Sequence, residues 1–250
     1  MRYSLLETPV DVLSFDETVG RAIDAMEKHD LCVHVALNAA KLVKMRKDPV
    51  LQTDVRGADI IGIDGMAIVW ALQIMGGPRA ERVSGVDLMQ ALLEQCARLG
   101  YRPFILGARQ EHLERAATVA RQRWPRLEFA GLRNGYFTRD EEDTIVAEIR
   151  ASGADCLFIA MPTPRKERFL AAHGRSLGVT FIMGVGGSID VLAGHVDRAP
   201  VWMQKFGLEW LFRLIQEPRK MFWRYTSTNI QFVLVLAKAW LRREWVGPAI

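Results

Sequence analysis

The sequence has little cysteine and no long hydrophobic run, and each shortage argues against a class of protein. Only three cysteines occur in 250 residues, without a CxxC pair or a Cys/His cluster, which argues against a zinc site or a disulfide framework. No hydrophobic run approaches the roughly 20 residues of a membrane span, and residues 1–19 lack the apolar segment of a signal peptide. We therefore expect a cytoplasmic protein, soluble or peripherally attached to a membrane, whose cysteines are buried free thiols.

Signatures of several enzyme classes are missing as well. The chain has no full GxGxxG spacing, no GK[ST] phosphate loop and no GxSxG elbow, and its five histidines lack the spacing of metal ligands. These absences argue against a nicotinamide-dependent oxidoreductase, and we expect neither a bound metal nor a cofactor.

Basic charge is concentrated at the C-terminal end. Residues 201–250 contain eight basic and three acidic residues, a net charge of +5, whereas the whole chain has a net charge of +4. The basic character of the protein therefore belongs to its tail. We expect a catalytic domain at residues 1–200 and a C-terminal helical appendage at residues 201–250.

Short apolar runs alternate with amphipathic stretches between residues 31 and 190. The pattern predicts strands at 31–37, 58–63, 102–106, 128–132, 155–161 and 179–183, and helices at 39–46, 65–75, 110–123, 139–152 and 164–177. Such alternation is typical of an α/β fold with a mostly parallel sheet and helices on both faces. Ligands of these sheets bind beyond the C-terminal ends of the strands, so residues that follow a strand are the candidates for function.

Asp64 and Arg82 are the candidates for catalysis. Asp64 directly follows a predicted strand, where a carboxylate can take a proton from an attacking hydroxyl, although capping of the next helix is the commoner role. Arg82 lies in a loop before a helix, where it could neutralise a leaving diphosphate. The alternative is a surface arginine followed by a helix-capping pattern of Ser84 and Asp87.

Other strand ends supply candidates for substrate binding. The glycine-rich segment 184–190 leads from a strand into a helix, which suits a diphosphate or is only a tight turn. Residues 164–167 begin a helix and either face the same cleft or are solvated. The substrate-binding candidates are Asn38, Gly107, Pro164, Lys166, Glu167, Gly184, Gly186, Gly187 and Asp190.

The tail combines tryptophans with basic residues. Five of the seven tryptophans lie within 202–246, and Pro218 predicts a break between two short helices, followed by a further helical stretch at 230–245. This composition is typical of an interfacial helix on anionic lipid. Nucleic-acid binding, packing onto the core and self-association into a homo-oligomer are the alternatives. The low polar content of residues 230–239 disfavours nucleic acid.

In this order, the segments resemble the WecG/TagA/CpsF family of bacterial glycosyltransferases, over residues 31–243. The resemblance rests most of all on the stretch from the glycine-rich turn to the start of the tail. The matching positions are Leu37-Asn38, Asp64-Gly65, Arg82, Gly85, Asp87, 184–190, 193–194, 198–200, 207–210, 213–214 and 217–219.

The resemblance implies a Rossmann-like fold and metal-independent transfer of a sugar, with inversion, from a UDP-sugar to a sugar on a polyprenyl diphosphate. It places the protein on the cytoplasmic face of the inner membrane, in exopolysaccharide or surface-glycan assembly. It also implies that Asp64 is the general base, that Arg82 binds the diphosphate and that Asn38 lies in the substrate pocket. Arg213, Arg219 and Arg224 of the tail would then contact the lipid diphosphate.

Two positions depart from the family pattern. The family commonly has Thr where Ala36 stands and Gln where Lys166 stands. Both positions belong to the expected sugar pocket, so N-acetylmannosamine, glucose, another hexose and a uronic acid all stay open as the transferred sugar. The alternative function is a non-enzymatic, membrane-bound nucleotide-binding or interaction protein, which explains the tail but leaves Asp64 and Arg82 without a role.

Overall fold

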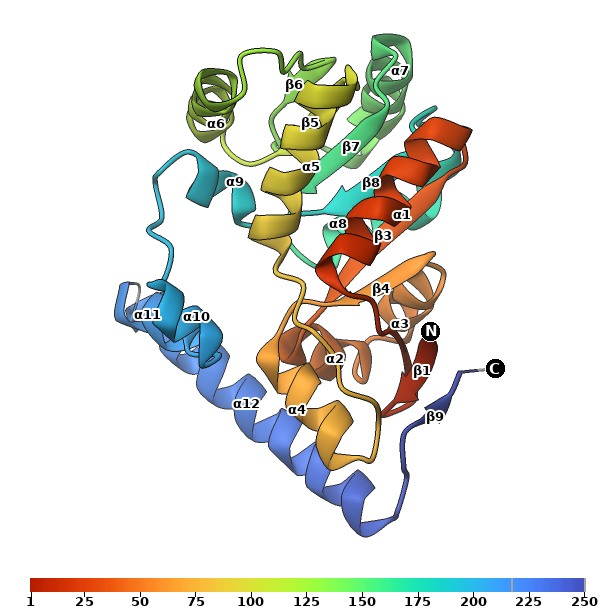
Figure 1. The fold of residues 1–250 in the computed structure, drawn as a ribbon, viewed down its shortest axis with the longest axis vertical. Coiled ribbons are helices and arrows are strands. Elements are labelled where there is room, and N and C mark those ends of the chain that lie inside the picture. Colours follow the sequence, from red (N-terminus) through yellow and green to blue (C-terminus); the bar gives the residue numbers. More distant parts are fainter. Residues whose placement is uncertain (217, 250) are drawn as a thin grey trace.

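The computed structural model describes residues 1–216 and 218–249, apart from the side chains at positions 205, 219–221, 224 and 225. Six parallel strands form the main sheet in the order β4-β3-β8-β7-β5-β6 (Figure 1). The predicted α/β fold with a parallel sheet is therefore confirmed. The strands are β3 (Cys32–Leu37), β4 (Ile60–Ile63), β5 (Pro103–Gly107), β6 (Gly131–Arg133), β7 (Cys156–Ala160) and β8 (Phe181–Gly184).

Helices cover both faces of this sheet because alternate residues of each strand point to opposite sides. Ile105 and Phe158 share a core with α1, α5, α6 and α9 on one face. Their sequence neighbours Phe104 and Leu157 pack against α7 and α8 on the other face. These helices are α1 (Phe15–Lys28), α5 (Gly85–Leu99), α6 (Gln110–Arg123), α7 (Glu142–Ser152), α8 (Arg165–His173) and α9 (Ser188–Leu192).

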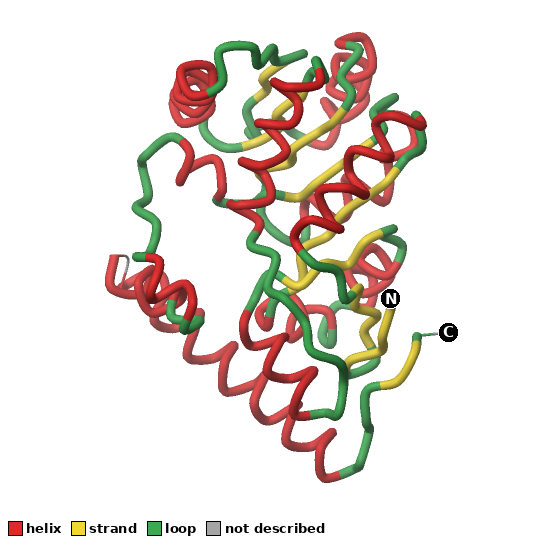
Figure 2. The backbone as a smooth tube through the Cα atoms, in the orientation of Figure 1, coloured by secondary structure: helices red, strands yellow, loops and turns green. Residues whose placement is uncertain are grey.

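A further core lies beside β4, at the edge of the main sheet. Here a small antiparallel sheet of order β2-β1-β9 joins the two ends of the chain, which lie close together in Figure 2. The carboxylate of Asp11 in β2 accepts a hydrogen bond of 2.7 Å from the Ile61 N–H, which ties this sheet to β4. The elements here are β1 (Arg2–Leu5), β2 (Thr8–Asp11), β9 (Gly247–Pro248), α2 (Ala39–Met45), α3 (Pro49–Arg56) and α4 (Met66–Ile74).

The appendage consists of α10 (Val201–Lys205), α11 (Glu209–Gln216) and α12 (Pro218–Leu241). Pro218 begins α12, so the predicted break is confirmed, since proline is tolerated at the first position of a helix. The prediction of short helices after this break is wrong. No proline or glycine interrupts the chain until Gly247, and α12 runs as one helix of 24 residues that packs on α2.

Several element boundaries differ from the sequence prediction. The predicted helices at 139–152 and 164–177 each include a 3-10 turn, at Arg139–Glu141 and Gly174–Ser176. The strand predicted at 128–132 is the shorter β6, because Phe129 and Ala130 only lead into it. None of the described helices is long and apolar enough to cross a membrane.

Candidate active site

Asp64 lies where β4 ends, and its backbone and side chain join three elements. Its N–H donates to the Leu37 carbonyl at the end of β3 (3.0 Å), and its Oδ1 accepts from the N–H of Gly85, the first residue of α5 (2.9 Å). The interpretation of Asp64 as a cap of the next helix is wrong, because Gly65 is the N-cap of α4 and no side chain caps that helix.

The surroundings of Asp64 favour a carboxylate that can accept a proton. Burial raises the pKa of Asp64, and the Gly85 N–H and the Arg82 guanidinium oppose this by stabilising the charged form. The side chain keeps some contact with solvent despite the protein atoms around it. A carboxyl group with a raised pKa that is still reachable is suited to general base catalysis.

A buried carboxylate held by two lysines lies near this site. The Glu167 Oε1 atom is 2.9 Å from the Lys41 ammonium and 3.2 Å from the Lys166 ammonium, and accepts a hydrogen bond from Thr163 (3.0 Å). Burial alone would raise the pKa of Glu167, but the two lysines outweigh it and hold this pKa at about 2. Burial and the charge of Lys41 lower the pKa of Lys166 to about 8, and Asp64 is among the charges that act on this lysine.

Asn38 adjoins the loop of Asp64 from the neighbouring strand. A Cβ atom on Gly65 would lie 3.3 Å from the Asn38 Cβ atom, so the two residues are in close contact. The Asn38 Oδ1 atom accepts from the Lys41 N–H (3.0 Å) and caps α2. Asn38 therefore has a structural role beside the substrate contact predicted for it.

The glycine-rich turn after β8 reaches the same region. A Cβ atom on Gly184 would lie 2.9 Å from the Lys166 Cε atom, so the Lys166 side chain crosses closely over the end of β8. Gly186 has φ +53°, a left-handed conformation that favours glycine. A Cβ atom on Gly85 would lie 3.8 Å from Asp64 Oδ1 and 4.0 Å from the Ser188 hydroxyl, so β4, α5 and α9 meet there.

Asp190 has a partner that sequence reasoning missed. Its Oδ1 atom lies 2.7 Å from Nδ1 of His112 on α6, and the His112 ring lies 4.1 Å from the ring of His195. The Asp190 Oδ2 atom lies beside Gly187, at 3.8 Å from the position of a Cβ atom. His112 and Asp190 are 78 positions apart, and a search for metal-ligand spacing gives no signal for such a pair.

Gly107 has a backbone role that the sequence did not indicate, and Pro164 lies one position outside the helical turn predicted for it. Gly107 has φ +128°, and a Cβ atom there would lie 2.4 Å from the Ala160 carbonyl oxygen, so the packing of β5 against β7 requires glycine. Gly107 is also remote from Asp64, because three strands separate β5 from β4. Pro164 is the N-cap residue of α8 and not part of its first turn, since the helix begins at Arg165.

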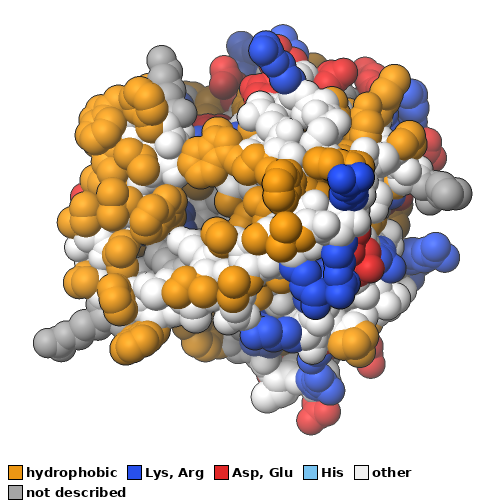
Figure 3. All heavy atoms as spheres, turned by 90° about the horizontal axis from the view of Figure 1, so that it is seen from below, with side chains coloured by type: hydrophobic (Ala, Val, Ile, Leu, Met, Phe, Trp, Pro, Cys, Tyr) orange, Lys and Arg blue, Asp and Glu red, His pale blue; other side chains and the backbone are white. Residues whose placement is uncertain are grey.

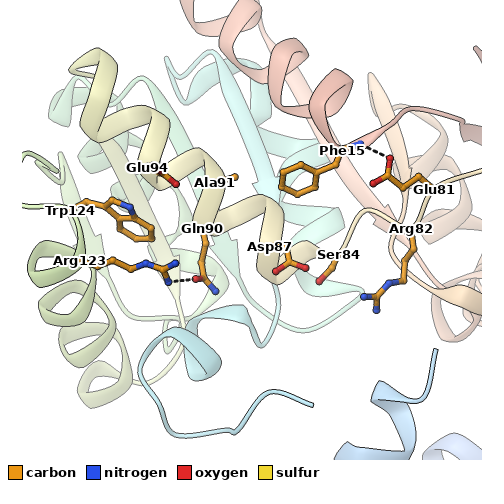
Figure 4. A pocket seen from close by; sticks show the side chains of 10 residues that line it. All are labelled: Phe15, Glu81, Arg82, Ser84, Asp87, Gln90, Ala91, Glu94, Arg123 and Trp124. Carbon is orange, nitrogen blue, oxygen red and sulfur yellow. Dashed lines mark hydrogen bonds between the residues drawn. The ribbon is translucent and has the colours of Figure 1, made fainter. Parts of the chain in front are cut away.

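Arg82 lines a polar cavity of about 420 Å³ beside α5 (Figure 4). Its guanidinium pairs with the Glu209 carboxylate of α11, so the appendage contributes to this region. The capping interpretation of Ser84 and Asp87 is wrong in its chemistry. Ser84 is the N-cap residue of α5 without a side-chain hydrogen bond, and Asp87 binds Arg198 instead. The remaining walls of the cavity are Phe15, Glu81, Gln90, Ala91, Glu94, Arg123 and Trp124.

Of the three arginines predicted to contact a lipid diphosphate, only Arg213 has a described side chain. It lines a small hollow of about 20 Å³ together with Arg198 and Glu209. The side chains of Arg219 and Arg224 lie outside the described residues.

The parts of the site thus come from the ends of β3, β4, β7 and β8, and from α11. Among the described residues, no group of three or more His, Cys, Asp or Glu side chains is arranged to hold a metal ion. The buried lysines and Arg82 supply positive charge near the Asp64 carboxylate, which suits chemistry on an anionic substrate. The sequence profile of the glycosyl transferase WecG/TagA/CpsF family matches residues 3–245, and the chain therefore belongs to this family of glycosyltransferases.

Proposed function

We propose that the protein transfers a hexose from a UDP-sugar to a sugar on a polyprenyl diphosphate, at the cytoplasmic face of the bacterial inner membrane. The observation that carries this proposal is the position of Asp64. This carboxylate lies at the C-terminal edge of the parallel sheet, where ligands of such folds bind, and is surrounded by cationic side chains. The product would serve exopolysaccharide or surface-glycan assembly.

The proposed reaction is a single displacement with inversion and no bound metal. Asp64 takes the proton of the acceptor hydroxyl, whose oxygen attacks the anomeric carbon of the donor from the face opposite UDP. The bond between that carbon and the diphosphate oxygen breaks, and UDP departs with the bonding electrons. Arg82 stabilises the negative charge that develops on the diphosphate.

Lys166 and Glu167 support a neutral hexose as the transferred sugar. Lys166 donates to Thr163 (2.8 Å) and to Glu167, so its ammonium is already engaged with protein acceptors. The Oε2 atom of Glu167 is buried without a hydrogen-bond partner among the described residues and can accept from a hydroxyl group. A uronic acid would bring its carboxylate towards this ionised group, which is unfavourable.

An exposed apolar face supports docking on a membrane. Figure 3 shows hydrophobic side chains gathered on the face formed by α4 and the appendage. In α12, Phe232 and Ala239 are buried against the core while Val233 and Leu234 are 60% and 63% exposed. A helix that is apolar on both sides needs a second apolar environment, and the exposed Lys238 and Arg242 suit anionic lipid. The other exposed large hydrophobic residues of α4 and of the appendage are Trp70, Ile74, Val201, Trp202, Phe206, Trp210, Ile215, Phe222, Trp223, Ile230, Trp240, Leu241 and Trp245.

A donor screen tests the proposed reaction. The protein is incubated with a short-chain polyprenyl-diphosphate sugar and a panel of UDP-sugars, and released UDP is measured. We expect release with one hexose donor that depends on the acceptor. Asp64→Asn should lower kcat by at least about a hundredfold while UDP binding changes little, because general base catalysis contributes about 10²–10⁴-fold.

Asp143→Asn is the matched control, because Asp143 is exposed in the first turn of α7. It should turn over at the wild-type rate. Wild-type turnover by Asp64→Asn would contradict the role of Asp64, and UDP release without an acceptor would contradict transfer to a lipid-linked sugar.

A further inference from the structure

Four charged side chains of alternating sign connect the appendage to the active site. We name this set, Asp87, Arg198, Glu209 and Arg82, the charge chain. Arg198 donates to both carboxylate oxygens of Asp87, and its Nε atom lies 3.8 Å from Glu209 Oε1. The other oxygen of Glu209 accepts a hydrogen bond from Arg82. The chain therefore runs from α5, through the segment before α10, to α11 and back to the loop before α5.

The charge chain is shielded from solvent at the end that matters for catalysis. The side chains of Arg82 and Glu209 are 14% and 26% exposed, whereas that of Asp87 is 39% exposed. Ion pairs removed from water are stronger and more fixed in geometry than surface pairs. The Nε atom of Arg198 is buried without a hydrogen bond among the described residues, and the Glu209 carboxylate lies 3.8 Å from it.

Glu209 also acts on Asp64. The charged groups that face Asp64 are Arg82 from the loop before α5, Lys41 from α2, Lys166 from α8 and Glu209 from α11. Glu209 is the one acid among these four, and its charge raises the pKa of Asp64 while Arg82 lowers it. Through its bond to Arg82, Glu209 compensates the positive charge with the largest effect on the pKa of Asp64, which keeps Asp64 more basic.

We propose that Glu209 is a positioning residue that holds the Arg82 guanidinium beside Asp64, and that it does so only when the Asp87–Arg198 pair docks α11 on the core. This inference rests on the proposed roles of Asp64 and Arg82. It makes the appendage part of the catalytic arrangement as well as a docking surface. Without α11 docked on the core, Arg82 would lack the carboxylate that holds it.

Glu209→Gln tests the proposal, since it keeps the size of the side chain and removes its charge. The misplaced Arg82 should lower kcat at least about tenfold, since small displacements of a catalytic group have large effects on rate. Loss of the negative charge should lower the pKa of Asp64, so the acid limb of the kcat/KM profile should move to lower pH. Glu209→Asp keeps the charge and should retain the wild-type acid limb.

Glu244→Gln is the matched control, because Glu244 is also an acid of the appendage, 47% exposed and 3.8 Å from Arg242. It should leave kcat and the pH profile unchanged. Wild-type kcat in Glu209→Gln would overturn the proposal. The proposal would also be overturned if Glu209→Gln had a lower kcat, an unchanged acid limb and faster amide exchange at residues 201–216. Glu209 would then only stabilise the appendage.

A second readout separates this proposal from the proposed reaction. If the wild-type protein releases no UDP from any of the donors, the proposed reaction is refuted, and the inference is then tested by stability alone. The free energies of unfolding of Glu209→Gln, Arg82→Gln and the double variant form a double-mutant cycle with the wild-type protein. Non-additive effects of the two single changes support the coupling of Glu209 to Arg82. Additive effects overturn it.

Discussion

The lysine at position 166 should make the stability of the protein rise with pH in the alkaline range. Its side chain is 10% exposed, and its pKa is lowered from 10.5 to about 8, mainly by burial. This difference corresponds to a cost of about 3 kcal/mol for holding the charged lysine in the folded state. Below pH 8 the lysine is charged in both states and the full cost applies. Between pH 8 and 10.5 the unfolded state binds more protons, so the folded state gains stability as pH rises.

The measurement compares wild-type protein with Lys166→Met, which has a similar length but no charge. Urea unfolding at pH 7.5, 8.5 and 9.5 gives the free energy of unfolding of each protein. The wild-type value should rise relative to the variant by about 2 kcal/mol between pH 7.5 and 9.5. Taking the difference cancels the titration of groups that the two proteins share.

Lys28→Met is the control, because the Lys28 side chain is 65% exposed and pairs with Asp24 on its own helix. Its difference from wild type should stay constant over this pH range. A constant difference for Lys166→Met as well would refute the reasoning. It would mean that Lys166 is hydrated in solution or that Glu167 compensates its charge fully.

Three further outcomes follow from the packing. Gly107→Ala should lower the free energy of unfolding by about 3 kcal/mol or more, because strain at φ +128° adds to a backbone clash. Gly153→Ala, at φ +63° with open space around the new Cβ atom, should lower it by about 1 kcal/mol. Urea unfolding measures both values. His112→Phe keeps a ring but leaves Asp190 of α9 without its hydrogen-bond partner, and should lower the free energy of unfolding by about 1–3 kcal/mol in urea. Ile74→Ser on the exposed face of α4 should weaken sedimentation with anionic vesicles about fivefold, and Val50→Ser on α3 should not.

The main sheet could be predicted because its strands are short, continuous apolar runs that end in turn residues. β7 is such a run, buried at four of its five positions, and the helix at 110–123 was predicted with the bounds of α6. Helices α1 and α5 were not predicted as elements, although Ser14 and Glu17 form a capping box at the start of α1. The strands β1, β2 and β9 are four, four and two residues long, and such short segments give almost no local signal.

The position of Asp64 could be predicted because a residue that follows a parallel strand must lie at the edge where ligands bind. Its neighbours could not. Glu209 lies 127 positions from Arg82, and Lys41 lies more than 120 positions from Glu167, so only the fold brings these charges together. Sequence spacing reports contacts within one element, whereas these pairs depend on how helices and strands pack.

The pairing of β9 with β1 has a mechanical consequence for α12. The helix begins at Pro218 and packs on α2, and the chain beyond Leu241 returns to the small sheet, where β9 pairs with β1. From there β1 pairs with β2, and the hydrogen bond from Ile61 to Asp11 continues into β4, the strand that Asp64 directly follows. If α12 docks on lipid as proposed, a force on this helix acts through the hydrogen-bonded series of strands on the base of the site. Because both ends of α12 are connected to the rest of the protein, we expect the helix to shift as one body and not to swing about one end.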